Sequence, residues 1–390
     1  MRLWGYQTQH SNIEYAKTIE SPTVKFIGPG VDRSAWLEAC RFSEASGLAV
    51  IYRRHYEPGD QDLGYPEGAA QGVHDDLLSD LLTLGKRPKH LFVEGWNEYG
   101  LWEQAASASR FVFRLARLLG EDGLKLLAYS FSVGNPSGYS NRLPGEALEE
   151  WVERSLKPYI AHYVPGLEEV MRWGGGLSLH EYAPDLSDDS VPWLIGRHRL
   201  FHMALPDHLK NIPIYITEFG FDQDMHGTNT GWRHYLTADG YARRLRATNA
   251  YFQGSIQLGV NLKGVHIFGA DMTDTWSTFD IIPSVPIAYE LRELNQEKEE
   301  PMPTNSVEAW LSDMWTRAGV PPTKQEGDKV FDWAVRRAKN YGEAFVPQPT
   351  LDENYQNWTE SDRWVVCYMY PKPVYFEKNV WEPRPGFPPQ

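Results

Sequence analysis

Eight short apolar runs that alternate with helical patterns are the feature of this sequence that most limits its fold. Most of the runs are almost continuously apolar, as expected for strands that are buried on both faces of a parallel sheet. The runs occupy residues 3–6, 23–27, 48–52, 91–96, 125–131, 177–179, 212–217 and 263–268. Helical spacing separates them. We predict, for example, a helix over residues 75–84, where Leu77, Leu78, Leu81 and Leu82 lie on one helical face, and another over residues 192–209. The alternation predicts an α/β fold, a closed (β/α)8 TIM barrel.

A doubly wound open sheet is the alternative arrangement for strands that alternate with helices. That fold usually carries a glycine-rich phosphate turn after an early strand. The turn after the second run is Gly28-Pro29-Gly30, which lacks that spacing. The barrel is therefore the favoured prediction.

The chain changes character after residue 297, where a charged and then proline-rich segment, 296–303, has the composition of a linker. We predict a catalytic barrel over residues 1–297 and a small α+β accessory domain over 298–390. In the second region, residues 310–318 and 330–341 have helical patterns, 364–370 and 374–376 suit a hairpin, and 381–390 is a proline-rich tail.

Charge and cysteine content exclude several classes of protein. The 390 residues carry a net charge of −14, which argues against binding to nucleic acid or to anionic membranes. The two cysteines, Cys40 and Cys367, are too few for a disulfide framework or a cysteine metal site. No secretory leader and no membrane-spanning run is visible, so we expect a cytoplasmic protein as written, with export or phage-mediated release left open. The oligomeric state is not indicated.

Two glutamates follow predicted strands in similar contexts. Glu98 closes the segment HLFVEGWNEYG, and Glu218 closes IPIYITEFG. If strand alternation continues to its end, Glu94, Trp96 and Glu98 share one face. The carboxyl ends of parallel barrel strands open at one mouth, so both glutamates would point into it. Glycoside hydrolysis needs such a pair of carboxyl groups.

With these residues, the sequence resembles clan A of the glycoside hydrolases over about residues 1–290. Asn97-Glu98, with an acid four residues earlier at Glu94, resembles the strand-four signature of the clan. Thr217-Glu218-Phe219-Gly220 resembles its strand-seven signature, and His180-x-Tyr182 its strand-six pattern. The resemblance implies a retaining enzyme with Glu98 as acid/base and Glu218 as nucleophile. It also implies that Tyr182 hydrogen-bonds the nucleophile.

The neighbouring polar residues extend this hypothesis. By the resemblance, Asn97 would hold the 2-hydroxyl of the sugar, and His180 and Tyr182 would donate hydrogen bonds to Glu218. Glu94 needs a cationic partner inside the barrel. Arg53 or Arg54 at the end of the third strand would provide it, and the sequence does not say which of the two points inward. His180 is equally compatible with a satisfied core histidine.

The aromatic residues are harder to assign. Clan members usually carry a tryptophan at the end of strand eight, as a floor for the sugar. Here that strand ends at Phe268, so Phe268 or the later Trp276 would take its place. Trp96 is a further candidate platform. Any one of the 15 tryptophans is more often a core residue.

Acidic loop residues raise the question of a metal. Asp222, Asp224 and His226 form one such group, and Asp271 and Asp274 another. Solvated loops explain both groups, so we predict no metal and no cofactor.

The sequence thus predicts a retaining glycosidase that cleaves β-linked polysaccharide or oligosaccharide, with a carbohydrate as its partner. A carbohydrate-binding barrel without catalysis and a phage-type cell-wall lytic glycosidase are the alternatives. A metal-dependent barrel hydrolase is disfavoured because the first two strands carry no His-x-His.

Overall fold

The computed structural model describes residues 2–8, 12–57, 60–99, 102–135, 143, 146–187, 192–223, 230–272, 274–296, 374–377 and 380–383. The chain divides into two units, Met1–Glu297 and Lys298–Gln390, which are treated separately below.

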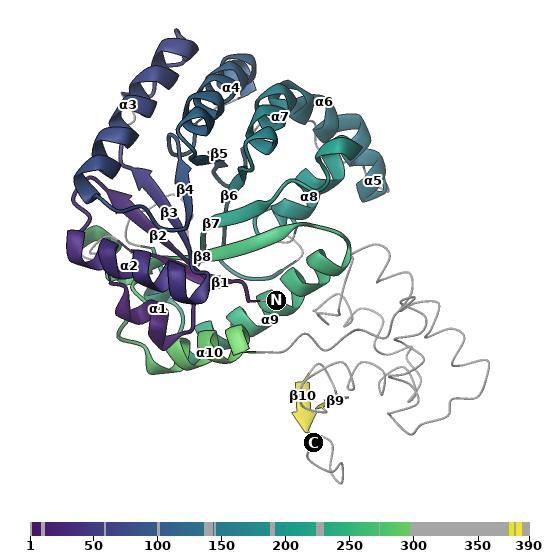
Figure 1. Ribbon diagram of the computed structural model, residues 1–390. Helices are drawn as coiled ribbons and strands as arrows, with labels where there is room; N and C mark the ends of the chain where they lie inside the picture. Colours follow the sequence, from purple (N-terminus) through teal and green to yellow (C-terminus); the bar gives the residue numbers. More distant parts are fainter. Residues whose placement is uncertain are drawn as a thin grey trace. The chain divides into compact units, whose positions relative to one another are not determined.

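Eight parallel strands close into a barrel in the first unit (Figure 1). Strand β1 pairs with β2 on one side and with β8 on the other, which closes the sheet. The strands are β1 (Trp4–Thr8), β2 (Thr23–Gly28), β3 (Ala49–Arg54), β4 (His90–Glu94), β5 (Lys125–Phe131), β6 (Gly176–Ala183), β7 (Ile214–Phe221) and β8 (Leu262–Ala270). The predicted (β/α)8 barrel is therefore confirmed, and the open doubly wound sheet is excluded.

The barrel interior changes from apolar to charged along the strands. Ile51, Phe92, Leu127 and Tyr215 form a buried apolar cluster, in which the rings of Phe92 and Tyr215 lie 5.2 Å apart. Two residues further along a strand the side chain returns to the same face. Ile51 is thus followed on its face by Arg53, and Phe92 by Glu94. The charged residues therefore lie next to this apolar cluster, on the side towards the carboxyl ends of the strands.

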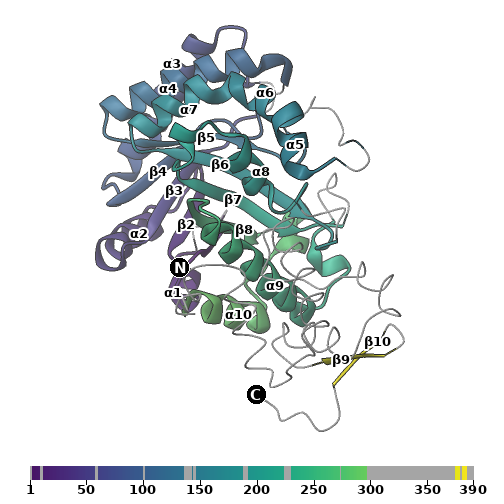
Figure 2. The ribbon, with the colours of Figure 1, turned by 90° about the vertical axis from the view of Figure 1, so that its right-hand side faces the viewer.

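Helices cover the outside of the barrel (Figures 1 and 2). They are α1 (Glu14–Thr18), α2 (Arg33–Ser46), α3 (Pro66–Leu84), α4 (Ala105–Glu121), α5 (Leu148–Trp151), α6 (Lys157–Ile160), α7 (Val164–Arg172), α8 (Arg197–Ala204), α9 (Ala238–Gln257) and α10 (Val285–Gln296). Helix α2 shows why the ends fall where they do. The Asp32 side chain accepts a hydrogen bond from the Ala35 N–H, and Gly47 ends the helix with φ +77°.

Two predicted helices have different bounds in the structure. A helix over 75–84 begins at Pro66, because proline is favoured in the first turn and the glycines at 68 and 72 only weaken the helical pattern. A helix over 192–209 is reduced to Arg197–Ala204.

In the second unit, the described residues form one antiparallel pair, β9 (Val374–Glu377) with β10 (Val380–Pro383). Strand β10 lies partly in the segment expected to be an extended tail. The predicted elements at 310–318, 330–341 and 364–370 lie outside the described residues. Among the helices in the described ranges, none combines the length and apolar character needed to cross a bilayer.

Candidate active site

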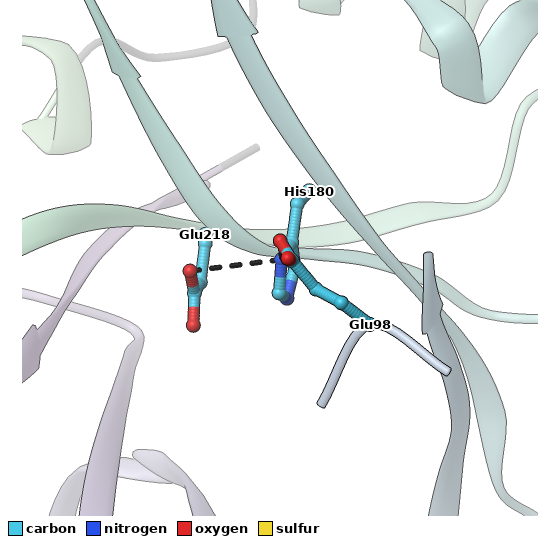
Figure 3. Close-up of side chains that lie close together, drawn as sticks. All are labelled: Glu98, His180 and Glu218. Atoms are coloured by element: carbon cyan, nitrogen blue, oxygen red, sulfur yellow. Dashed lines mark hydrogen bonds and ion pairs between the residues drawn. The ribbon is translucent and has the colours of Figure 1, made fainter. Parts of the chain in front are cut away.

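Glu98 and Glu218 meet at the carboxyl ends of the barrel strands. One carboxylate oxygen from each and a ring nitrogen of His180 all lie within 4.8 Å of one another (Figure 3). The Nδ1 atom of His180 lies 2.8 Å from Oε1 of Glu98 and 3.6 Å from Oε2 of Glu218. The two glutamates and the histidine therefore form one cluster, as the sequence predicts.

The two glutamates are held differently. Glu218 lies within β7 and its side chain is 8% exposed, whereas the side chain of Glu98 is 41% exposed. Glu98 follows the end of β4 and has φ +51°, in the left-handed region that non-glycine residues adopt rarely. Its N–H donates to the Ser130 carbonyl over 3.2 Å. The nucleophile candidate thus sits on a strand and the acid candidate on a turn.

The early end of β4 corrects the assignment of Trp96. Strand alternation stops at Glu94, so Trp96 does not share a face with Glu94 and Glu98. Trp96 is 3% exposed and stacks on Phe111 of α4, with ring centroids 4.4 Å apart. It is a core residue between the barrel and its helices, and it leaves the set of candidate sugar platforms.

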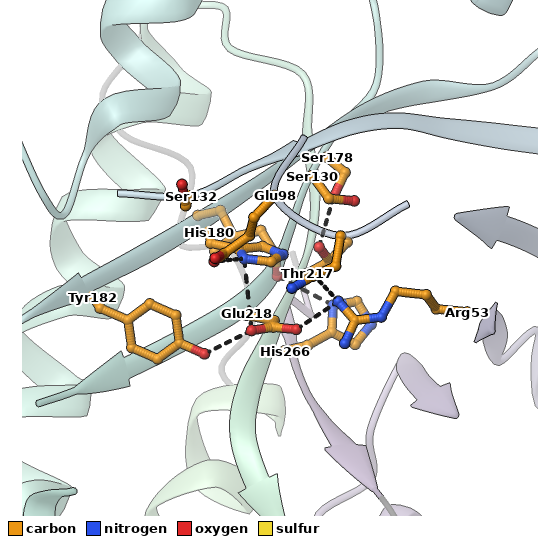
Figure 4. A network of polar contacts seen from close by, with 12 residues as sticks. Arg53, Glu98, Ser130, Ser132, Ser178, His180, Tyr182, Thr217, Glu218 and His266 are labelled. Carbon is orange, nitrogen blue, oxygen red and sulfur yellow. Dashed lines mark hydrogen bonds and ion pairs between the residues drawn. The ribbon is translucent and has the colours of Figure 1, made fainter. Parts of the chain in front are cut away.

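Two cationic side chains and one hydroxyl group contact Glu218, and Figure 4 shows Arg53 and Tyr182 next to it. Its Oε1 lies 2.9 Å from Arg53 Nη1 and 3.3 Å from Lys25 Nζ, and Tyr182 donates its hydroxyl to Oε2 over 3.0 Å. Burial raises the pKa of a carboxyl group, but His180, Lys25 and Arg53 outweigh burial and hold the pKa of Glu218 well below its ordinary value. Glu218 is therefore ionised near neutral pH.

Lys25 of β2 is the residue that the sequence analysis missed. Its side chain is 0% exposed, and its Nζ lies 2.8 Å from Oε2 of Glu94. Burial lowers the pKa of Lys25, and the two carboxylates oppose that effect. The direct contact with Glu94 is thus made by Lys25, and of the two arginines expected as its partner, Arg53 acts on Glu94 through its charge without a direct contact. The signal was available, since a lysine within an otherwise apolar, centrally paired strand requires a buried partner.

Glu94 itself is fully buried and satisfied on its other oxygen. Ser130 and Ser178 donate hydroxyls to Oε1 over 3.2 and 2.8 Å. Burial raises the pKa of Glu94, but Lys25, Arg53 and His180 lower it to about 2. Glu94 therefore remains an anion at neutral pH.

Acid should destabilise the barrel through Glu94. The pKa of this group is 4.5 when unfolded and about 2 when folded, so its stabilising effect is complete above pH 4.5 and is lost as the pH falls towards 2. That contribution is about 3 kcal/mol. We expect the free energy of unfolding of Glu94→Gln, followed by urea titration at several pH values, to fall less steeply over this window than that of the wild type. The exposed Glu103 provides the control, and equal slopes in Glu94→Gln and Glu103→Gln would contradict the prediction.

The structure separates the two arginines of β3. Arg53 points into the barrel and donates to the side-chain oxygen of Asn97 as well as to Glu218. Arg54 points outward, where its Nη1 lies 2.8 Å from Oδ1 of Asp80. Arg53 therefore belongs to the cluster and connects Asn97 to it. Arg54 does not belong to it.

Aromatic side chains line one side of the cluster. Phe268 of β8 is 8% exposed and packs edge-on against Tyr182 and Trp276, with ring centroids 5.9 and 5.2 Å away. Trp276 is half-buried in the short helix Asp274–Phe279. Of these two candidates, Trp276 has more ring surface available for a ligand.

The group Glu98, His180 and Glu218 has the donor types of a metal site. Lys25 and Arg53 already contact Glu218, however, and their charges repel a cation there. The loop group at 222–226 lies partly outside the described residues. This cluster is arranged to hold an ionised carboxylate rather than a metal.

A second buried network has the geometry of a catalytic triad. Nδ1 of His198 lies 2.9 Å from Oε1 of Glu181, and Nε2 of His198 lies 2.7 Å from the Ser255 hydroxyl. All three side chains are 0% exposed, and Ser255 donates to the Tyr251 carbonyl. Because no substrate can reach Ser255, this network ties α8 and α9 to β6 and is structural.

No family model matches the chain, and no curated protein sequence matches it. Solved structures with a similar fold include a broad-specificity endoglucanase from Clostridium longisporum, with 12% identity, a TM-score of 0.44 and coverage of 74% of this chain and 86% of that one. A modular endo-β-1,4-mannanase from Cellulomonas fimi has 14% identity, a TM-score of 0.46 and coverage of 76% and 70%. An endo-β-1,4-glucanase from Xanthomonas axonopodis pv. citri has 15% identity, a TM-score of 0.40 and coverage of 76% and 100%. At these values the similarity carries no argument about substrate or catalytic residues.

Proposed function

We propose that this protein is a retaining glycoside hydrolase that acts on a β-linked polysaccharide or oligosaccharide. The observation that carries the proposal is the approach of Glu98 and Glu218, whose nearest oxygens lie within 4.8 Å at the mouth of the barrel. Retaining enzymes hold their two carboxyl groups about 5–5.5 Å apart, and inverting enzymes about 6.5–9.5 Å apart. The short separation favours retention.

The reaction takes two steps. Glu218 attacks the anomeric carbon while Glu98 gives its proton to the departing glycosidic oxygen, which leaves a glycosyl ester on Glu218. Glu98, now a carboxylate, then takes a proton from water, the water oxygen bonds to the anomeric carbon, and the ester electrons return to Glu218.

The environments of the two glutamates fit these roles. The nucleophile must be ionised, and Glu218 has Arg53, Lys25 and Tyr182 to keep it so. The acid must reach solvent to exchange its proton, and Glu98 is the more exposed of the two. Arg53 donates a hydrogen bond to Asn97, which would bind the sugar 2-hydroxyl. Trp276 and Phe268 offer an aromatic surface for the sugar ring.

The test is intact-mass spectrometry after incubation with a panel of 2-deoxy-2-fluoro-β-glycosides bearing a dinitrophenyl leaving group. The fluorine slows both steps, and the activated leaving group makes the glycosyl ester accumulate. We expect the mass to rise by one fluorosugar, peptide mapping to place it on Glu218, and Glu218→Gln to prevent it. The sugar that labels the protein identifies the class bound next to the cleavage point.

Glu103→Gln is the matched control because Glu103 is an exposed glutamate. A label on another residue would remove Glu218 from its role. If no probe labels the protein and it releases no sugar from β-glucan, mannan, xylan or peptidoglycan, the proposal is wrong. The inactive carbohydrate-binding barrel would then be the better description, whereas peptidoglycan hydrolysis alone would favour a lytic glycosidase.

A further inference from the structure

Lys25 places an ammonium group beneath Glu218, where no solvent reaches it. We propose that Lys25 is a positioning residue for the reaction of Glu218, and that Glu94 is the counter-charge that keeps Lys25 in place throughout the catalytic cycle. This inference rests on the proposed function, in which Glu218 is the nucleophile.

The contacts of Lys25 fix its position. An ammonium group has three N–H donors. Its nitrogen lies 2.8 Å from Glu94, 3.3 Å from Glu218 and 3.4 Å from the Thr217 carbonyl. These acceptors come from β4 and β7, so Lys25 of β2 links three strands across the barrel. Two hydrogen bonds and the ion pair with Glu94 hold this flexible side chain in one position.

The contacts also distinguish the two oxygens of Glu218. Both cations, Lys25 and Arg53, contact Oε1, whereas Tyr182 and His180 lie next to Oε2. Oε1 is therefore the oxygen that the two cations hold in place. Oε2, which accepts the Tyr182 hydroxyl and lies 3.6 Å from His180, is the oxygen that would form the ester.

The charge balance explains why Glu94 is needed. In the free protein, Glu94 and Glu218 balance Lys25 and Arg53. When Glu218 becomes a neutral ester, Lys25 and Arg53 together exceed Glu94 by one positive charge, and the two cations at Oε1 favour return of the ester electrons to Glu218. Lys25 therefore assists departure of the sugar more than attack on it.

Other titratable groups also face Glu218. They are Arg53 from β3, Glu98 from the turn after β4, and His180 and Tyr182 from β6. His266 of β8 interacts with Lys25, and burial lowers the pKa of His266 to about 4, so it is neutral near pH 7. Lys25 and Glu94 can be replaced by neutral residues while all of these other side chains are kept.

The test uses the double variant Lys25→Met/Glu94→Gln. The single change Lys25→Met would leave Glu94 buried as an unpaired anion and risk unfolding. The double variant removes both charges and keeps an acceptor for Ser130 and Ser178. The matched control is Arg54→Met/Asp80→Asn, which removes an ion pair of 2.8 Å from the outer face of β3.

The first measurement needs no substrate. In protein labelled with ¹³C at the glutamate carboxyl carbons, the Glu218 resonance is assigned by its absence in Glu218→Gln and followed against pH. We expect the Glu218 carboxylate to titrate about 1 pH unit or more higher in the double variant than in the wild type and the control. If the Lys25–Glu94 pair is purely structural, its removal will lower Tm and leave the titration midpoint of Glu218 unchanged. That result would overturn the proposal.

The second measurement follows the two chemical steps with the fluoroglycoside that labels the wild type. We expect the trapped ester to hydrolyse about tenfold more slowly in the double variant, the rate equivalent of one pKa unit, while labelling slows less. Unchanged hydrolysis of the ester would overturn the role of Lys25 in sugar departure. Failure of the wild type to be labelled would instead count against the proposed function, and the carboxyl titration would still test whether Lys25 positions Glu218.

Discussion

Replacing Glu218 by glutamine should lower kcat/KM by about 10⁴-fold or more for every substrate, because the amide cannot form the glycosyl ester. The substitution keeps the size of the side chain and an acceptor oxygen for Arg53, and its amide nitrogen can donate to the Tyr182 hydroxyl, so the fold should survive. Steady-state hydrolysis of the labelling sugar, as its dinitrophenyl glycoside, measures the loss. Circular dichroism checks the fold.

Glu98→Gln is the informative comparison, because the proposed acid matters only when the leaving group needs a proton. We expect this variant to attack a dinitrophenyl glycoside at close to the wild-type rate and to fail on a glycoside with an alkyl leaving group. If both variants lose activity equally on both substrates, Glu98 and Glu218 do not divide the work between acid and nucleophile.

Replacing Trp96 by alanine should lower the free energy of unfolding by about 3–5 kcal/mol, the usual cost of emptying a buried tryptophan site. Trp96 is buried and stacked on Phe111, so the lost contacts are with α4 and not with a sugar. We expect KM to stay within twofold of the wild type. Urea unfolding and steady-state kinetics on the same preparations measure both quantities.

Trp276→Ala is the matched control, since Trp276 is half-buried beside Phe268 and Tyr182. Loss of one aromatic stacking contact of about 1 kcal/mol should raise KM about fivefold, with a smaller effect on stability than Trp96→Ala. The reverse pattern, with KM raised in Trp96→Ala alone, would show that the aromatic surface has been assigned to the wrong tryptophan.

The barrel was predictable because its strands are apolar on both faces. A run such as Leu126–Leu127–Ala128 needs no knowledge of its neighbours to be recognised as buried. The two glutamates were also predictable, because each follows such a run. The bounds of helices were harder to predict where the residues favour no secondary structure strongly. Helix α3 starts nine residues earlier than expected, because the glycines in its first turns weaken the helical pattern.

The details of the site depend on which way the backbone turns, and sequence spacing does not give that. Alternation was extended past Glu94 and placed Trp96 on the wrong face, although Gly95, a residue that often interrupts a strand, directly follows β4. The choice between Arg53 and Arg54 needed the register of β3. Lys25 comes from a strand 69 residues before Glu94, so only the closed barrel brings them together.

The location of Glu98 has a consequence for how such a barrel could diverge. Glu218 is fixed by strand pairing and by cations from two other strands, whereas Glu98 is held on a turn with a left-handed backbone. Inserting or deleting a residue after Glu94 would move Glu98, the proposed acid, by several ångströms and leave Glu218, the proposed nucleophile, in place. The separation of the Glu98 and Glu218 carboxyl groups, on which retention or inversion would depend, is thus set by a turn, and turns tolerate insertions and deletions better than strands do.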